Sequence, residues 1–66
     1  MTLSINGQPR QFPGPLSVRR LVDTLDLAGK RCAVERNGEI VPRGQFEAIE
    51  LADGDELEIV VAVGGG

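Results

Sequence analysis

The chain has 66 residues, of which 41% are hydrophobic and 26% are charged, and its ten acidic and seven basic side chains give a net charge of -3. This length allows one domain with a thin core, which excludes a second domain and a deep catalytic pocket built by this chain alone. The basic side chains are scattered along the sequence rather than clustered, so we expect no nucleic acid partner.

The side chains most often used in catalysis and metal binding are scarce. Histidine is absent and Cys32 is the only cysteine, so there is no internal disulfide and the commonest metal ligand is missing. Without a histidine base, Cys32 is predicted to be a small strand residue rather than a nucleophile. No apolar run could cross a bilayer, and no secretion signal is present. We therefore predict a cytoplasmic protein that is not an enzyme, binds no metal and does not associate with a membrane.

The first residues predict a β-hairpin. Polar and apolar residues alternate over residues 2–5, and Asn6-Gly7 follows as a two-residue turn that needs positive φ. The return strand covers residues 8–12, where Phe12 is expected in the core. Pro9 lacks a backbone donor and is therefore confined to an edge strand or a turn.

A short helix is predicted next. Ser17 is a suitable N-cap, and Gly29 stands where a C-terminal cap is expected. Arg19 and Arg20 are assigned to the solvated side of the helix. Apolar residues at i, i+3, i+4 and i+7 form the face that should cover a sheet: Val18, Leu21, Val22 and Leu25.

A second hairpin is predicted from residues 31–36, the turn Asn37-Gly38 and residues 39–41. Residues 43–49 are expected to form an irregular loop or a single helical turn with Phe46 packed inward. Four residues of this region are predicted to line the core: Cys32, Val34, Ile40 and Leu51.

The last strand is introduced by Asp53-Gly54-Asp55, a tight turn rather than a calcium loop, because the surrounding oxygen ligands are missing. Alternation along residues 56–63 gives the strand two faces. Leu57, Ile59, Val61 and Val63 should meet the helix; Glu56, Glu58, Val60 and Ala62 should form the outer face. Because this outer row becomes apolar toward its end, Val60 and Ala62 are predicted to dock on a partner.

Three glycines close the sequence. Glycine has no packing surface and a large backbone entropy, so we divide the chain into a domain over residues 1–63 and a flexible tail over residues 64–66. The absence of side chains on Gly64 and Gly65 would let the tail thread a narrow channel and present the carboxylate of Gly66 to another protein. A frayed end is the alternative.

These elements give an α+β fold with one sheet and one helix on one face. The segment Ala33-Val34-Glu35-Arg36-Asn37-Gly38-Glu39-Ile40-Val41-Pro42-Arg43, the turn at residues 53–55 and the glycine ending together resemble the ThiS family of sulfur carriers in thiamine biosynthesis. The resemblance covers essentially the whole chain and implies a ubiquitin-like β-grasp fold with a mixed sheet. The third glycine, Gly64, is a departure that leaves the terminal diglycine intact.

The resemblance also implies a function. In the family, a ThiF-like adenylyltransferase joins the terminal carboxylate, here that of Gly66, to AMP from ATP. Sulfur from a donor such as a cysteine desulfurase then replaces AMP and gives a thiocarboxylate. A ThiG-like thiazole synthase takes the sulfur to build the thiazole ring. The chain itself would bind no cofactor, and we expect it to be a monomer when it is not bound to these partners.

Three alternatives remain open at this point. The small subunit of molybdopterin synthase shares the turn and the glycine end, although it usually has a proline-rich approach to its glycines, where this chain has Val60-Val61-Ala62-Val63. A ubiquitin-like modifier would form isopeptide bonds through Gly66. A plain binding module would make no use of its tail.

Overall fold

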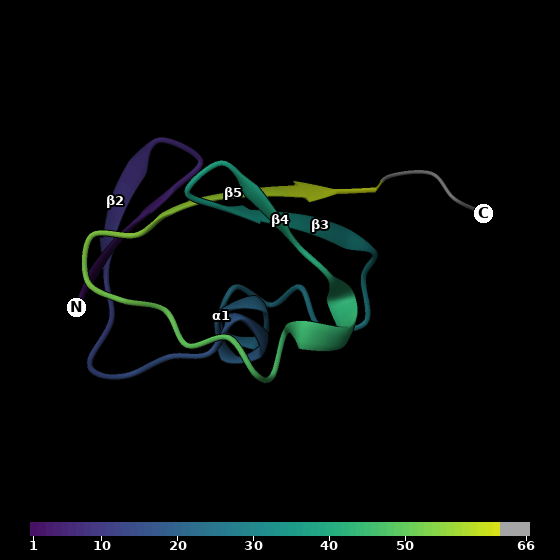
Figure 1. Cartoon of the computed structure of the whole chain (residues 1–66), viewed down its shortest axis with the longest axis horizontal. Coiled ribbons are helices and arrows are strands. Elements are labelled where there is room, and N and C mark those ends of the chain that lie inside the picture. The colour runs from purple at the N-terminus through teal and green to yellow at the C-terminus, as the bar shows by residue number, and fades with distance from the viewer. Residues whose placement is uncertain (63–66) are drawn as a thin grey trace.

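The computed structural model describes residues 1–62, in which a five-stranded mixed sheet packs on one α-helix (Figure 1). The elements in chain order are β1 (Thr2–Ile5), β2 (Gln8–Gln11), α1 (Val18–Thr24), β3 (Cys32–Arg36), β4 (Glu39–Val41), the 3-10 turn η1 (Arg43–Gln45) and β5 (Glu56–Val61). The strand order across the sheet is β2-β1-β5-β3-β4. The predicted α+β fold with a single helix-covered face is confirmed.

Both predicted hairpin turns are present. Asn6 and Gly7 have φ values of 51° and 84°, and Asn37 and Gly38 have 50° and 86°, which is the left-handed pair that a two-residue turn requires. Each turn joins antiparallel neighbours, whereas β1 and β5 pair in parallel at the centre of the sheet. Pro9 lies on the edge strand β2, as predicted.

Helix α1 begins as predicted. The Ser17 side-chain Oγ accepts a hydrogen bond from the Arg20 backbone N–H at 3.1 Å, so one of the unpaired donors of the first turn is satisfied. Val18, Leu21 and Val22 of the apolar stripe are buried under the sheet. The fourth residue, Leu25, is partly buried at the margin of the core. The helix therefore covers one face of the sheet with the side that its periodicity predicts.

The predicted C-terminal cap at Gly29 is wrong. The helix ends at Thr24, and Asp26 takes the left-handed conformation with φ 61°. The Leu27 N–H then reaches back to the Val22 carbonyl at 3.0 Å, a closure in which aspartate replaces the usual glycine. Gly29, with φ 85°, serves the following turn instead.

The core lies between the helix and the sheet. Within residues 1–62 it contains twelve buried apolar residues: Leu3, Ile5, Phe12, Val18, Leu21, Val22, Val34, Val41, Phe46, Leu51, Leu57 and Ile59. Phe12, Phe46 and Leu51 are there as predicted. Of the two alternatives for residues 43–49, the structure shows the single helical turn, η1, directly before Phe46.

Ile40 was predicted to be in the core, and this is wrong because its side chain is 74% exposed. The hairpin register pairs Val34 with Val41 and Glu35 with Ile40. Since directly paired residues of antiparallel strands point to the same face, Val41 joins Val34 in the core and Ile40 joins Glu35 outside.

The turn that introduces β5 has the predicted form. Gly54 has φ 89°, and the Asp55 N–H donates to the Ala52 carbonyl at 3.0 Å. Asp53 adds a link to the N-terminal strand, because its Oδ1 accepts from the Thr2 N–H. The turn thus fixes the start of β5 beside β1.

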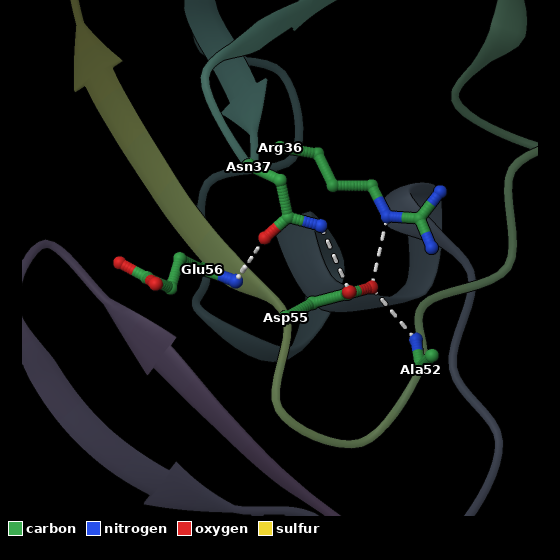
Figure 2. Close-up of polar contacts among 5 residues, drawn as sticks. All are labelled: Arg36, Asn37, Ala52, Asp55 and Glu56. Carbon is green, nitrogen blue, oxygen red and sulfur yellow. Dashed lines mark hydrogen bonds and ion pairs between the residues drawn. The ribbon is translucent and has the colours of Figure 1, made fainter.

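The sequence did not predict that the Asp55 carboxylate is buried and hydrogen-bonded. Its carboxylate is 7% exposed and receives three hydrogen bonds, shown in Figure 2: Oδ2 accepts from Arg36 Nε and from the Ala52 N–H, both at 2.8 Å, and Oδ1 accepts from Asn37 Nδ2 at 3.0 Å. Asn37 Oδ1 in turn accepts from the Glu56 N–H at 2.9 Å. We call Arg36, Asn37 and Asp55 the Asp55 cluster; it ties the β3–β4 turn to the start of β5.

Two opposing effects act on the pKa of Asp55. Burial raises it, and the hydrogen bonds from Ala52, Asn37 and Arg36, together with the Arg36 charge, lower it; the net result is a pKa below the ordinary aspartate value. The folded state therefore favours the ionised carboxylate that the three donors need.

Candidate functional site

The predicted docking residues lie at the end of β5 on the face opposite the helix. Val60 is 66% exposed, and Ala62 is exposed as well. Between them, Val61 alternates to the helix side and pairs with Cys32 of β3. The Ala62 N–H donates to the Arg31 carbonyl at 2.9 Å, which keeps the chain alongside β3 to the end of the described residues. The predicted orientation of Val60 and Ala62 is confirmed, and their contact with a partner stays a prediction.

A shallow groove of about 510 Å³ opens beside these two residues. We call it the β5 groove; it is lined by Arg31, Cys32, Ala33, Arg43, Val60 and Ala62. Ala33 lies opposite Val60 in the strand register. Because its side chain is a single methyl group, it leaves room beside Val60 for an apolar side chain from another molecule.

A second hollow of about 300 Å³ adjoins the groove between the helix end and η1. Four basic residues border it, so we call it the basic cleft: Arg19, Lys30, Arg31 and Arg43. Arg31, Cys32 and Arg43 line both cavities. The seven basic residues look scattered in the sequence, yet the fold brings four of them to one place, which spacing along the chain could not reveal.

The other end of the outer face has the opposite charge. Near the Asn37-Gly38 turn, a hollow of about 310 Å³ is lined by Glu35, Glu56 and Glu58. No group of three potential ligands among residues 1–62 is arranged to hold a metal ion. The outer face therefore runs from an acidic end to an apolar end bordered by arginines.

Cys32 is a free thiol that packs against the core, in line with its predicted role as a small strand residue. Within residues 1–62, no helix has the length and apolar character to cross a membrane. Several predictions fall outside the described residues. They are the helix-facing side chain of Val63, the domain boundary after residue 63, and the threading and loading roles of Gly64, Gly65 and Gly66. Their roles stay predictions.

Comparison with known proteins adds what the geometry alone does not give. The family model described as the ThiS family matches residues 3–66. This chain belongs to the ThiS family. It is 40% identical to the sulfur carrier protein ThiS of Bacillus subtilis, over 97% of this chain and 98% of that protein. The crystal structure of the thiamine biosynthesis protein ThiS from Geobacter metallireducens is 38% identical and superposes with a TM-score of 0.85 over the full length of both chains.

A thiazole synthase of Paramagnetospirillum magneticum is 44% identical to this ThiS-family chain over all 66 residues. The chain spans 20% of the length of that protein. A ThiS-like segment therefore forms part of a thiazole synthase chain in this relative, and the same holds for a thiazole synthase of Magnetococcus marinus.

These findings confirm the resemblance and the β-grasp fold predicted from the sequence. The predicted function, a sulfur carrier of thiamine biosynthesis, is that of the family to which the chain belongs, and the molybdopterin alternative is not favoured.

Proposed function

We propose that the chain carries sulfur as a thiocarboxylate on Gly66 and delivers it for thiazole formation. The observation that carries this proposal is the family match, which extends through the glycine ending to Gly66 itself. The domain formed by residues 1–62 would serve as the mount from which this ending is presented to partner enzymes.

Chemistry at Gly66 requires activation, because a carboxylate is a poor electrophile until one of its oxygens becomes a good leaving group. A ThiF-like adenylyltransferase would supply this step: a carboxylate oxygen attacks the α-phosphorus of ATP, pyrophosphate leaves, and an acyl adenylate forms. The persulfide of a donor such as a cysteine desulfurase would then attack the acyl carbon, and AMP leaves. A dithiol reductant would cleave the resulting S–S bond, so that the thiocarboxylate stays on Gly66 and the donor regains its thiol.

The loaded chain would pass its sulfur to a ThiG-like thiazole synthase and regain its carboxylate. The relatives in which a ThiS-like segment is part of a thiazole synthase chain support this partnership. The chain acts as a co-substrate rather than an enzyme, in keeping with its lack of histidine. It would work in the cytoplasm, bind no cofactor of its own and be a monomer between encounters.

Intact mass spectrometry tests the proposal. After incubation with ATP, a sulfur source and a ThiF-like adenylyltransferase, the chain should gain the mass difference between one sulfur and one oxygen atom, located on Gly66. A variant without Gly65 and Gly66 should remain folded and gain nothing. A wild-type chain that stays a carboxylate, while a known ThiS carrier is loaded under the same conditions, contradicts the proposal.

Growth assays separate the alternatives. The gene should rescue a thiazole-requiring strain and not a molybdopterin-deficient strain. A protein modifier would instead give higher-mass conjugates on a denaturing gel. Lys30 is the only lysine, so chains linked to one another through this protein's own lysines are limited to that site.

A further inference from the structure

We infer that the β5 groove and the basic cleft form one docking surface for an acidic partner, in which apolar side chains enter the groove and carboxylates pair with Arg31 and Arg43. This inference rests on the proposed function. It adds that the partner's surface that contacts this chain during loading is negatively charged. The partner segment it fits has an apolar centre with aspartate or glutamate residues on the side next to η1.

The distribution of charge supports this assignment. Although the chain has a net charge of -3, four of its seven basic residues border the basic cleft. Arg19 is paired with Asp23 at 3.5 Å, whereas Lys30, Arg31 and Arg43 form no ion pair within residues 1–62. No aspartate or glutamate of residues 1–62 lines either the cleft or the β5 groove. A local positive field on an acidic protein attracts an acidic partner to this place and not to the rest of the surface.

The two shared arginines are held by backbone contacts while their side chains stay exposed. The Arg31 carbonyl accepts the hydrogen bond from Ala62, and the Arg43 carbonyl accepts from the N–H of Phe46, whose side chain is buried. Among residues 1–62, neither guanidinium takes part in an ion pair. The backbone of both residues is therefore fixed, and their exposed guanidinium groups are available to a carboxylate, with which a guanidinium can form two parallel hydrogen bonds.

The acidic end of the same face would set the orientation of the complex. Glu56 and Glu58 precede Val60 on β5, and they lie near Glu35. A partner rich in carboxylates is repelled by this end and attracted by the other, so it docks over Val60 and Ala62. Like charges facing each other disfavour the reversed arrangement.

Charge reversal tests the inference. The double variant R31E/R43E is compared with R10E/R20E, which changes the net charge equally at two exposed residues that line neither cavity. The assay is pyrophosphate release by a ThiF-like adenylyltransferase already shown to load the wild-type chain, at salt concentrations from about 50 to about 500 mM. Thermal unfolding of each variant establishes that it is folded.

R31E/R43E should raise the KM for the carrier by about tenfold or more at low salt while kcat changes little, since the arginines act in docking. R10E/R20E should remain within about twofold of wild type, and the wild-type KM should rise with salt. Equal KM values for the two double variants, or a wild-type KM insensitive to salt, overturn the inference. If no ThiF-like adenylyltransferase that loads the wild-type chain can be found, the proposed function is contradicted instead.

Discussion

The two ends of β5 are built in opposite ways. Just before its start, Asp55 is almost completely buried and accepts three hydrogen bonds, two from the adjacent residues Arg36 and Asn37 and one from Ala52. At its end, Val60 and Ala62 face outward beside an open groove. The strand thus begins beside a buried polar group whose side-chain oxygens all have partners, and it ends with apolar surface exposed.

This difference separates stability from function along a single strand. A buried carboxylate with several donors fixes the register of the strands around it, because any displacement leaves unpaired polar groups. An exposed apolar groove contributes little to folding, since its side chains remain in water, but it is ready for burial by a partner. Substitutions at the two ends should therefore affect different measurements.

The largest effect on folding is expected for Asp55→Ala. It would leave Arg36, Asn37 and the Ala52 N–H without their acceptor, so the free energy of unfolding should fall by about 2 to 4 kcal/mol. Urea denaturation at neutral pH measures this loss. A loss below about 1 kcal/mol would mean that the cluster adds little to stability beyond what water provides.

At the other end of β5, Val60→Asp should leave stability within about 0.5 kcal/mol, because the side chain is exposed. It should raise the KM for loading by a ThiF-like enzyme about tenfold or more, since docking would lose the apolar contact and bring a new carboxylate against an acidic partner. The matched control is Ile40→Asp, which makes the same kind of change at an exposed residue of the outer face that does not line the groove. Equal effects of the two variants on KM would remove the groove from the docking surface.

The Asp55 cluster should also make stability depend on pH. Because the pKa of Asp55 is lowered in the folded state, its contribution is complete above the unfolded value of about 4 and is lost as pH falls through the lower folded value. In Asp55→Asn this contribution is absent, so the difference in unfolding free energy between wild type and variant should shrink as pH falls below about 4. Urea denaturation from neutral pH to about pH 3 measures it, and a difference that stays constant would assign the pH dependence to other carboxylates.

Local sequence patterns predicted most of the fold, because turn chemistry and alternation act over a few residues. Asn6-Gly7 and Asn37-Gly38 indicated both hairpins, and Ser17 indicated the start of the helix. The partners of the two asparagine side chains could not be predicted in this way. Asn6 forms two hydrogen bonds with the backbone of Ile59, 53 residues away, and this contact exists only because β1 and β5 pair in parallel.

The wrong placement of Ile40 and the missed basic cleft also depend on how the elements pair and pack in the folded chain. Ile40 was placed in the core because it is apolar, but the hairpin register exposes it and buries Val41. For the site, alternation correctly predicted that Val60 and Ala62 face outward. The basic cleft was not predicted, because Arg19 and Arg43 come from α1 and η1, which are distant in sequence and meet only in the folded chain.

The smallest effects should come from replacing Ile40 and Val60, the two exposed large apolar residues within residues 1–62, by threonine. Each substitution keeps a β-branched side chain on a strand, so the free energy of unfolding should change by less than about 0.5 kcal/mol in both variants. Loading should distinguish them. Val60→Thr should raise the KM by a few fold, because a hydroxyl would enter an apolar contact, whereas Ile40→Thr should leave the KM unchanged. If Ile40→Thr weakens loading as much as Val60→Thr, the docking surface extends across β3 to β4. Docking would then not be confined to the outer face at the end of β5.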